Sequence, residues 1–200
     1  MASLSAPCFR FDADEHEYIH LATGRVLPHI TGMLTRMGHV DDRWFTDESR
    51  KRGQAVHTLA AHYDLGAIED ARHLTRSVYA RYSGWLQAHA KARSLIRPLE
   101  MLGVEEPEVH PHYLYGGRPD RKVLIYGLKG VLELKSGPPE KAHLIQTALQ
   151  AILVAPTLQL PPEMVARFCL YLKSNGKFVL EQHTNKGDFL EAQRVIRACC

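Results

Sequence analysis

The periodicity of the sequence changes at Pro98, and this change limits the possible fold more than any other feature. Before Pro98, apolar residues recur at helical spacing from Asp47 to about Gly66 and from Ala71 to Ile96, where the proline prevents continuation. After it come short β-prone runs, with Asn175-Gly176 as the strongest hairpin signal. One helical segment, Glu140 to Ala155, interrupts those runs. This order predicts an α+β fold.

The predicted strands lie on both sides of that helical segment. They are Tyr113–Tyr115, Lys122–Tyr126, Gly130–Lys135, Ala166–Leu172 and Lys177–Glu181. We expect them to form a central mixed sheet built from residues 106 to 182, with the Glu140–Ala155 helix crossing one face. A short helix is expected from Thr31 to Gly38 and a last helix from Asp188 to Ala198, while Phe11–Val26 indicates a hairpin or an extended arm.

Length and composition predict a single domain. The chain has 200 residues, of which 45% are apolar, and this is enough for one compact core. We expect residues 1–98 to form a mainly helical lobe and residues 99–200 to form the sheet core with its crossing and C-terminal helices. No stretch approaches the roughly 20 apolar residues of a membrane span, and the first 11 residues lack a signal-peptide pattern, so we expect a cytoplasmic protein without a membrane partner.

Positive charge is concentrated in the middle of the chain. Residues 49 to 97 hold nine Lys or Arg against three Asp or Glu, whereas residues 1 to 48 hold four against eight. Such a block can attract a phosphate backbone, because binding releases counterions from nucleic acid. The alternative is a solvated helix face, which charge alone favours. Within this block, Arg50, Lys51 and Arg52 are the candidate substrate-binding residues.

Glu133 and Lys135 are the first candidates for chemistry. Their run alternates, so in a strand Leu132 and Leu134 share one face while Glu133 and Lys135 project from the other. Asp120 starts the preceding predicted strand and could bring a second carboxylate to Glu133. Two carboxylates and the carbonyl of the intervening leucine suit a hard cation such as Mg²⁺. A local ion pair on a solvated strand is the alternative explanation.

These residues resemble the core of the PD-(D/E)XK nuclease superfamily. That core has an Asp near the start of one strand and Glu or Asp, any residue and Lys on the next, and Pro119-Asp120 and Glu133-Leu134-Lys135 match it. The resemblance implies a restriction-endonuclease-like core, in which helices flank a central mixed β-sheet, with an N-terminal helical lobe. It also implies that DNA phosphodiester bonds are hydrolysed with Mg²⁺ or Mn²⁺.

Further segments are similar to one branch of that superfamily, which contains RecB-like domains, phage-type exonucleases and the mitochondrial genome maintenance exonuclease. Arg52–His57 resembles its R-G-T-x-V-H helix motif, and Gly116–Asp120 resembles its strand motif. Gln146–Gln150 stands in the place of its Q-x-x-x-Y motif, with Gln150 where a Tyr is expected. Leu27–Thr31 resembles the L-P-S-V-T segment before its first helix. The resemblance covers roughly residues 18 to 155.

The resemblance implies that Asp120, Glu133 and the backbone carbonyl of Leu134 hold the metal ion. Lys135 then orients or deprotonates the attacking water, or stabilises charge electrostatically. Because the unperturbed pKa of lysine is near 10.4, the role of base would require a large downward shift. The electrostatic role is the less demanding one.

Three other positions receive roles from the same resemblance. His57 would bind a second metal ion or the scissile phosphate, with a buried structural histidine as the alternative. Gln146 would position the DNA chain or the water, since a neutral amide neither titrates nor binds Mg²⁺ strongly. Glu106 or Glu108 would be the additional acidic residue often found upstream in this branch, and a solvated charge is the alternative for either.

The cysteines argue against a metal cluster of another kind. Cys169, Cys199 and Cys200 lack the spacing of the nucleases that carry a four-cysteine iron–sulfur cluster, so we expect no iron–sulfur cluster.

The function expected from the sequence is that of a DNA exonuclease acting on single-stranded or frayed ends, in recombination, repair or phage DNA processing. The alternatives are a structure-specific endonuclease, a catalytically silent nuclease fold that binds DNA, and an unrelated α+β protein with a coincidental motif. The sequence leaves open the polarity of cleavage, the choice between DNA and RNA, and the oligomeric state.

Overall fold

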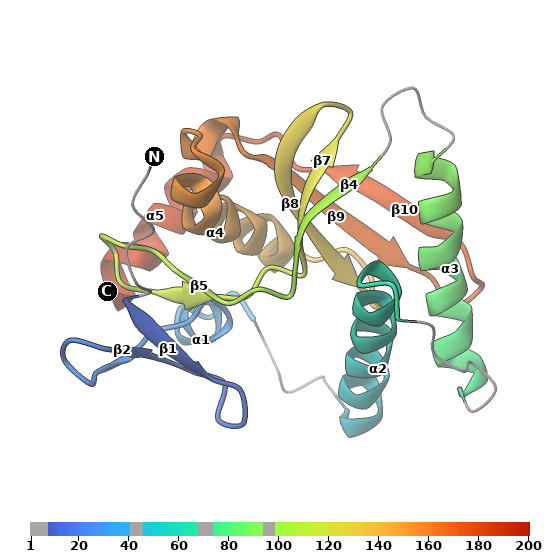
Figure 1. Cartoon of the computed structure of the whole chain (residues 1–200), viewed down its shortest axis with the longest axis horizontal. Helices are drawn as coiled ribbons and strands as arrows, with labels where there is room; N and C mark the ends of the chain where they lie inside the picture. The colour runs from blue at the N-terminus through green and yellow to red at the C-terminus, as the bar shows by residue number, and fades with distance from the viewer. Residues whose placement is uncertain (1–7, 41–45, 68–73, 94–98) are drawn as a thin grey trace.

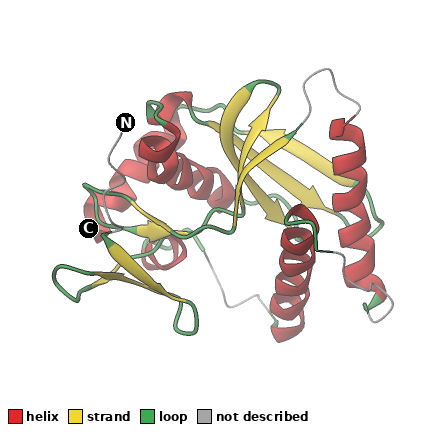
Figure 2. Cartoon of the chain, viewed as in Figure 1, coloured by secondary structure: helices red, strands yellow, loops and turns green. Residues whose placement is uncertain are grey.

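A computed structural model describes residues 8–40, 46–67, 74–93 and 99–200 of the chain (Figure 1). It is an α+β fold with a central mixed sheet flanked by helices, as the sequence predicts (Figure 2). The sheet has the order β10-β9-β8-β7-β4, and only the β8–β9 pair is parallel. Its strands are β4 (Glu100–Val104), β7 (Arg121–Ile125), β8 (Leu128–Lys135), β9 (Ala166–Leu172) and β10 (Phe178–Gln182).

Helices cover both faces of this sheet (Figure 1). On one face lie α1 (Ile30–Arg36), α4 (Lys141–Leu158) and α5 (Gly187–Cys199); on the other lie α2 (Asp47–Asp64) and α3 (Arg76–Arg93). The alternation of β8 follows the prediction. Val131 packs with α1, α4 and α5 on one face of the sheet, whereas Leu132 and Leu134 pack with α2 and α3 on the other. Glu133 and Lys135 therefore lie on the α4 side of the sheet.

The N-terminal region begins with strands. The expected hairpin is confirmed as β1 (Phe9–Asp12) and β2 (Glu17–His20), which pair antiparallel, and β3 (Val26–Leu27) adds a third strand. The short helix expected near Thr31 is α1. Both predicted ends of the Ala71–Ile96 helix lie outside the described residues. Among the described residues, α3 begins at Arg76 and ends at Arg93.

Turn chemistry explains where several elements end. Gly176 has a positive φ of 80°, which connects β9 to β10 at the predicted Asn175-Gly176 hairpin. α4 continues past Pro156, where the sequence predicted its end. Pro156 removes one backbone donor, but Leu158 of the following turn packs into the core, and the Gln159 N–H closes the helix by donating to the carbonyls of residues 155 and 156.

Two strand predictions were wrong. Residues Tyr113–Tyr115 form a turn, with Leu114 at a positive φ of 53°, between the short strands β5 (Glu108–Val109) and β6 (Gly116–Gly117). The central sheet also starts earlier than residue 106, because β4 pairs with β7 as an edge strand. A register shift between Met101 and Gly103 interrupts the alternation of β4, and this removes the pattern that would predict a strand.

Within the described residues, no helix is both long and apolar enough to cross a membrane.

The packing of α4 gives a test of the core. Leu149 is completely buried in the cluster between α4, α5 and the sheet. Leu149→Ala should lower the free energy of unfolding by about 2–5 kcal/mol, because it removes buried methyl groups and leaves a cavity. The matched control is Leu190→Ala on α5, whose side chain is 64% exposed and should change stability by no more than about 0.5 kcal/mol. Equal urea midpoints for the two variants would contradict this core assignment.

Candidate metal and active site

Three neighbouring strands bring three acidic residues to one end of the sheet. Val104 of β4 pairs with Arg121 of β7, and Arg121 pairs in turn with Leu132 of β8. The next position along each strand is acidic, since Glu105 follows β4, Asp120 precedes β7 and Glu133 lies in β8. The Glu105 amide donates to the Asp120 carbonyl at 3.1 Å, so the pairing continues to these residues. The three carboxylates therefore stand in one row across the sheet.

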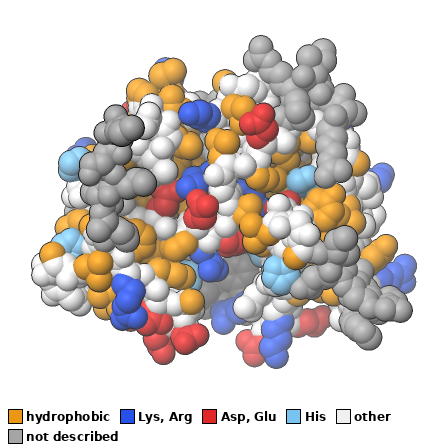
Figure 3. All heavy atoms as spheres, in the orientation of Figure 1, with side chains coloured by type: hydrophobic (Ala, Val, Ile, Leu, Met, Phe, Trp, Pro, Cys, Tyr) orange, Lys and Arg blue, Asp and Glu red, His pale blue; other side chains and the backbone are white. Residues whose placement is uncertain are grey.

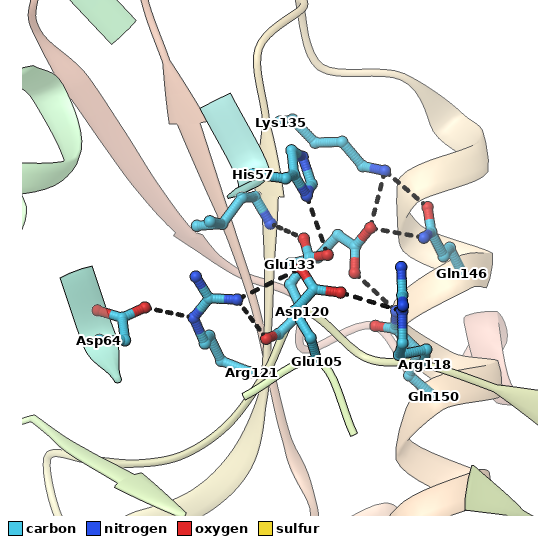
Figure 4. Close-up of polar contacts among 11 residues, drawn as sticks. His57, Asp64, Glu105, Arg118, Asp120, Arg121, Glu133, Lys135, Gln146 and Gln150 are labelled. Atoms are coloured by element: carbon cyan, nitrogen blue, oxygen red, sulfur yellow. Dashed lines mark hydrogen bonds and ion pairs between the residues drawn. The ribbon is translucent and has the colours of Figure 1, made fainter. Parts of the chain in front are cut away.

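Asp120 is buried and accepts hydrogen bonds from two elements. The backbone N–H of Leu134 donates to its Oδ2 at 2.7 Å, and Nδ1 of His57 on α2 lies 3.1 Å from its Oδ1 (Figure 4). Burial by itself raises the pKa of Asp120, but the charge and hydrogen bond of His57, the charge of Lys135 and the Leu134 amide outweigh it and lower the pKa. Asp120 is therefore an ionised carboxylate at neutral pH.

Glu133 is buried and held by three side chains on its α4 side. Its Oε1 accepts from Lys135 Nζ at 3.0 Å and from Gln146 Nε2 at 2.7 Å, and its Oε2 accepts from Gln150 Nε2 at 2.6 Å. Lys135 Nζ also donates to Gln146 Oε1 at 2.9 Å. The pairing of Glu133 and Lys135 predicted from the alternation is thus part of a larger network with α4, in which Gln150 occupies the position where a Tyr was expected.

Lys135 is a cation in this network. Burial lowers its pKa, but the carboxylates of Glu133 and Asp120 and the hydrogen bond to Glu133 raise it above the ordinary value. A protonated ammonium can stabilise a negative charge, but it cannot accept a proton.

Glu105 completes a group of possible metal ligands that the sequence did not identify. One ligand atom each from His57, Glu105 and Asp120 lies within 4.8 Å of the other two. Burial and the charge of Asp120 raise the pKa of Glu105 to about 7, which reflects the crowding of acidic groups. Burial lowers the pKa of His57, but Asp120 and then Glu133 raise it, to about 9. A bound cation would relieve the repulsion between the carboxylates and compete with the proton on His57.

The two acidic residues that the sequence offered in place of Glu105 lie elsewhere. Glu106 Oε2 and Glu108 Oε1 lie 2.7 Å and 2.6 Å from the Nζ of Lys122, and Thr157 donates to Glu108 as well. Glu105 reaches the site through a backbone φ of 50°, an uncommon conformation for a residue other than glycine. Such strain often accompanies functional positions.

The basic residues predicted at the start of α2 lie on different sides of the helix. Arg50 lines the same cleft as His57. The two residues are seven positions apart on α2, so they lie on the same helix face. Arg52 lines a separate groove, and Lys51 is exposed and lines neither. Only Arg50 of the three is therefore placed beside the acidic row.

The acidic row lies in a cleft of about 820 Å³. The walls are α2 on one side and the N-terminal strands with α1 on the other; Figure 3 shows the hollow between them, with charged side chains of both signs at its rim. The side chains that bring hydrogen-bonding capacity to it are His16, Tyr18, His29, Thr31, Arg50, Gln54, His57, Thr58, His62, Glu105, Arg118, Asp120, Glu133, Gln146 and Gln150. Two of their polar atoms, Tyr18 Oη and Gln150 Oε1, are buried and have no hydrogen-bond partner among the described residues.

A buried arginine fixes the acidic row to the helices behind it. The guanidinium of Arg121 contacts Asp64 at the end of α2, the carbonyl of Asp120 and the carboxylate of Glu105 (Figure 4). Asp64 also lies 2.9 Å from His89 of α3. This network holds Glu105 and the chain at Asp120 in place relative to α2, the helix that carries His57.

The donor set fits a hard divalent cation. It consists of carboxylate oxygens with one imidazole nitrogen, and Mg²⁺ and Mn²⁺ bind such oxygen-rich sites. The backbone carbonyl of Leu134 belongs to the same side of β8 as its N–H, because both groups of a strand residue face one neighbouring strand. That N–H donates to Asp120, so the carbonyl faces the cation-binding side of the strand.

Comparisons with known proteins add little to this geometry. No protein-family model matches the chain, and no curated protein matches it. A matching crystal structure from Eubacterium rectale is described as "Putative exonuclease"; it is 13% identical, the match covers 84% of this chain and 69% of that chain, and the TM-score is 0.46.

Glu105 and Glu106 offer a direct test of the ligand set. Glu105→Gln and Asp120→Asn should each weaken Mn²⁺ binding, measured by isothermal titration calorimetry, by about tenfold or more, because each removes a charge from the donor set. Glu106→Gln removes the same charge one residue away, where the carboxylate contacts Lys122, and should leave Mn²⁺ binding unchanged. If Glu106→Gln weakened binding and Glu105→Gln did not, the ligand assignment would be wrong.

Proposed function

We propose that this protein is a divalent-metal-dependent deoxyribonuclease that removes nucleotides from DNA ends, acting on single-stranded or frayed ends. The observation that carries the proposal is the row of Glu105, Asp120 and Glu133 beside the Lys135 ammonium, inside a cleft with basic residues. Acidic ligands for a cation next to a fixed positive charge are what phosphodiester hydrolysis requires, since charge develops on the phosphate as the water attacks.

The cation would be held by Asp120, Glu105 and His57, with Glu133 and the Leu134 carbonyl as further ligands from β8. A divalent cation at this position would polarise the phosphodiester and lower the pKa of a water molecule.

The protein's own side chains have distinct tasks in this proposal. Lys135 stabilises the negative charge that develops on the phosphate, and Gln146 fixes its ammonium by accepting a hydrogen bond from Nζ. Gln150 holds one oxygen of Glu133 with its amide nitrogen, while its Oε1 is buried without a partner among the described residues. That oxygen can accept a hydrogen bond from the attacking water and so orient it.

The dimensions of the cleft support a single strand as the substrate. A volume of about 820 Å³ lies within the range of pockets that enclose small molecules, so the cleft has room for one or two nucleotides of a strand. Arg50 and Arg118 lie at its walls and can contact phosphates without reading bases, while Arg118 also lies 3.2 Å from Glu105. The proposed activity is therefore tolerant of sequence.

Cleavage of end-labelled single-stranded DNA should depend on Mg²⁺ or Mn²⁺ and on the acidic row. Asp120→Asn, Glu133→Gln and Lys135→Ala should each reduce the rate by about 100-fold or more, because each removes a charge that the transition state requires. Glu163→Gln and Lys129→Ala, at exposed positions outside the cleft, are the matched controls and should keep the wild-type rate. Wild-type rates for Asp120→Asn under saturating metal would show that the site is misassigned.

The requirement for ends is tested separately with covalently closed single-stranded circles. A linear strand should be degraded to mononucleotides or short fragments, whereas the circle of the same sequence should persist, because it presents no terminus to the cleft. The two substrates are compared on a denaturing gel over the same time course. Degradation of the circle at the rate of the linear strand would replace this proposal with an endonuclease.

A further inference from the structure

A basic groove, separate from the cleft, lies on the other side of α2. It has a volume of about 600 Å³ and includes Arg52, Arg81, Ser136, Lys173 and Glu181 among its lining residues. It shares no lining residue with the cleft. Among the described residues that line it, three are cationic and Glu181 is the one carboxylate, so the groove has a net positive charge.

Arg81 is held rigidly at the end of β8. Its Nε donates to the Ser136 carbonyl at 3.0 Å, and one terminal nitrogen donates to the carbonyl and the hydroxyl of Ser77 at 3.0 Å and 2.7 Å. Ser136 directly follows Lys135. A guanidinium fixed in this way is preorganised to bind phosphate, because little conformational freedom is lost on binding.

Arg52 brings a second guanidinium close to Arg81, and the two repel each other. Burial and the charge of Arg52 both lower the pKa of Arg81. The Nε of Arg52 is buried and has no hydrogen-bond partner among the described residues. Two neighbouring cations with an unused donor are stabilised by an anion between them, and phosphate oxygens match the donor geometry of guanidinium groups.

The position of the groove relative to the acidic row indicates which phosphates of a DNA strand the groove would bind. Arg50 and Arg52 of α2 line the cleft and the groove, respectively. Glu133 of β8 lines the cleft, and Ser136, the first residue after β8, lines the groove. Three residues of a strand span about 10 Å, and this distance corresponds to about three nucleotides of stacked DNA. One DNA strand can therefore pass the acidic row in the cleft and also reach the groove.

We propose that this groove binds backbone phosphates of the same single DNA strand that the cleft hydrolyses, a few nucleotides from the reacting bond. The proposal rests on the proposed function for the identity of the strand. Phosphates are neutralised on both sides of the acidic row, and the strand is thereby held against carboxylates that would otherwise repel it. Because no base is contacted through these cations, binding in the groove is independent of sequence.

The test measures binding apart from hydrolysis. Fluorescence anisotropy with labelled oligothymidylates of increasing length, in EDTA and at several salt concentrations, gives the affinity and its salt dependence. Arg52→Gln with Lys173→Gln removes two groove charges and leaves the helix contacts of Arg81 intact. Lys129→Gln with Lys186→Gln removes two exposed charges away from the groove and is the matched control.

The groove variant should lose affinity for longer oligonucleotides, and its salt slope should fall by roughly 0.7 log units per lost phosphate contact, whereas the control keeps the wild-type slope. Equal slopes for the groove variant and the control would overturn the proposal. A groove variant with a reduced slope in a protein that cleaves no DNA with any divalent metal would support the groove and refute the nuclease. A wild-type protein that does not bind oligonucleotides would refute both.

Discussion

The site depends on the burial of one cation, the guanidinium of Arg121, among acidic groups at the end of the sheet. Arg121 is fully buried; it contacts Asp64 and Glu105 and packs over the ring of Trp85. Removing one partner of such a buried pair costs about 3–5 kcal/mol, because the remaining charge is left uncompensated. The network therefore fixes α2 and α3 against the sheet at the point where the acidic row begins, and it positions His57 beside Asp120.

Each carboxylate of the acidic row has partners within the protein. Lys135, Gln146 and Gln150 contact Glu133, His57 and the Leu134 amide contact Asp120, and the guanidinium groups of Arg118 and Arg121 lie 3.2 Å and 3.5 Å from Glu105. Burial and the charge of Asp120 nevertheless raise the pKa of Glu105 to about 7. In the proposed function, a divalent cation relieves the repulsion between these neighbouring carboxylates, and the basic side chains of the cleft and the groove bind the phosphate backbone.

Much of the architecture could be predicted because it depends on local patterns. The alternation of β8 assigned Glu133 and Lys135 to one face, and the Asn175-Gly176 turn marked the β9–β10 hairpin; both are confirmed. Elements with weak patterns were missed. The bulge in β4 removed its alternation, and Pro156 was taken as a helix end although packing of the following turn outweighs the lost hydrogen bond.

The sequence by itself determined the α+β order, the faces of the central strands and the residue types available for a cation. Only the tertiary structure decided which of the acidic residues 105, 106 and 108 joins Asp120, because that choice depends on a register shift in β4 and a positive φ at Glu105. It also separated Arg50 from Arg52, since residues two apart on a helix point to different sides. Local periodicity records which face a residue occupies, but the position of one element against another is set by packing between residues far apart in the chain.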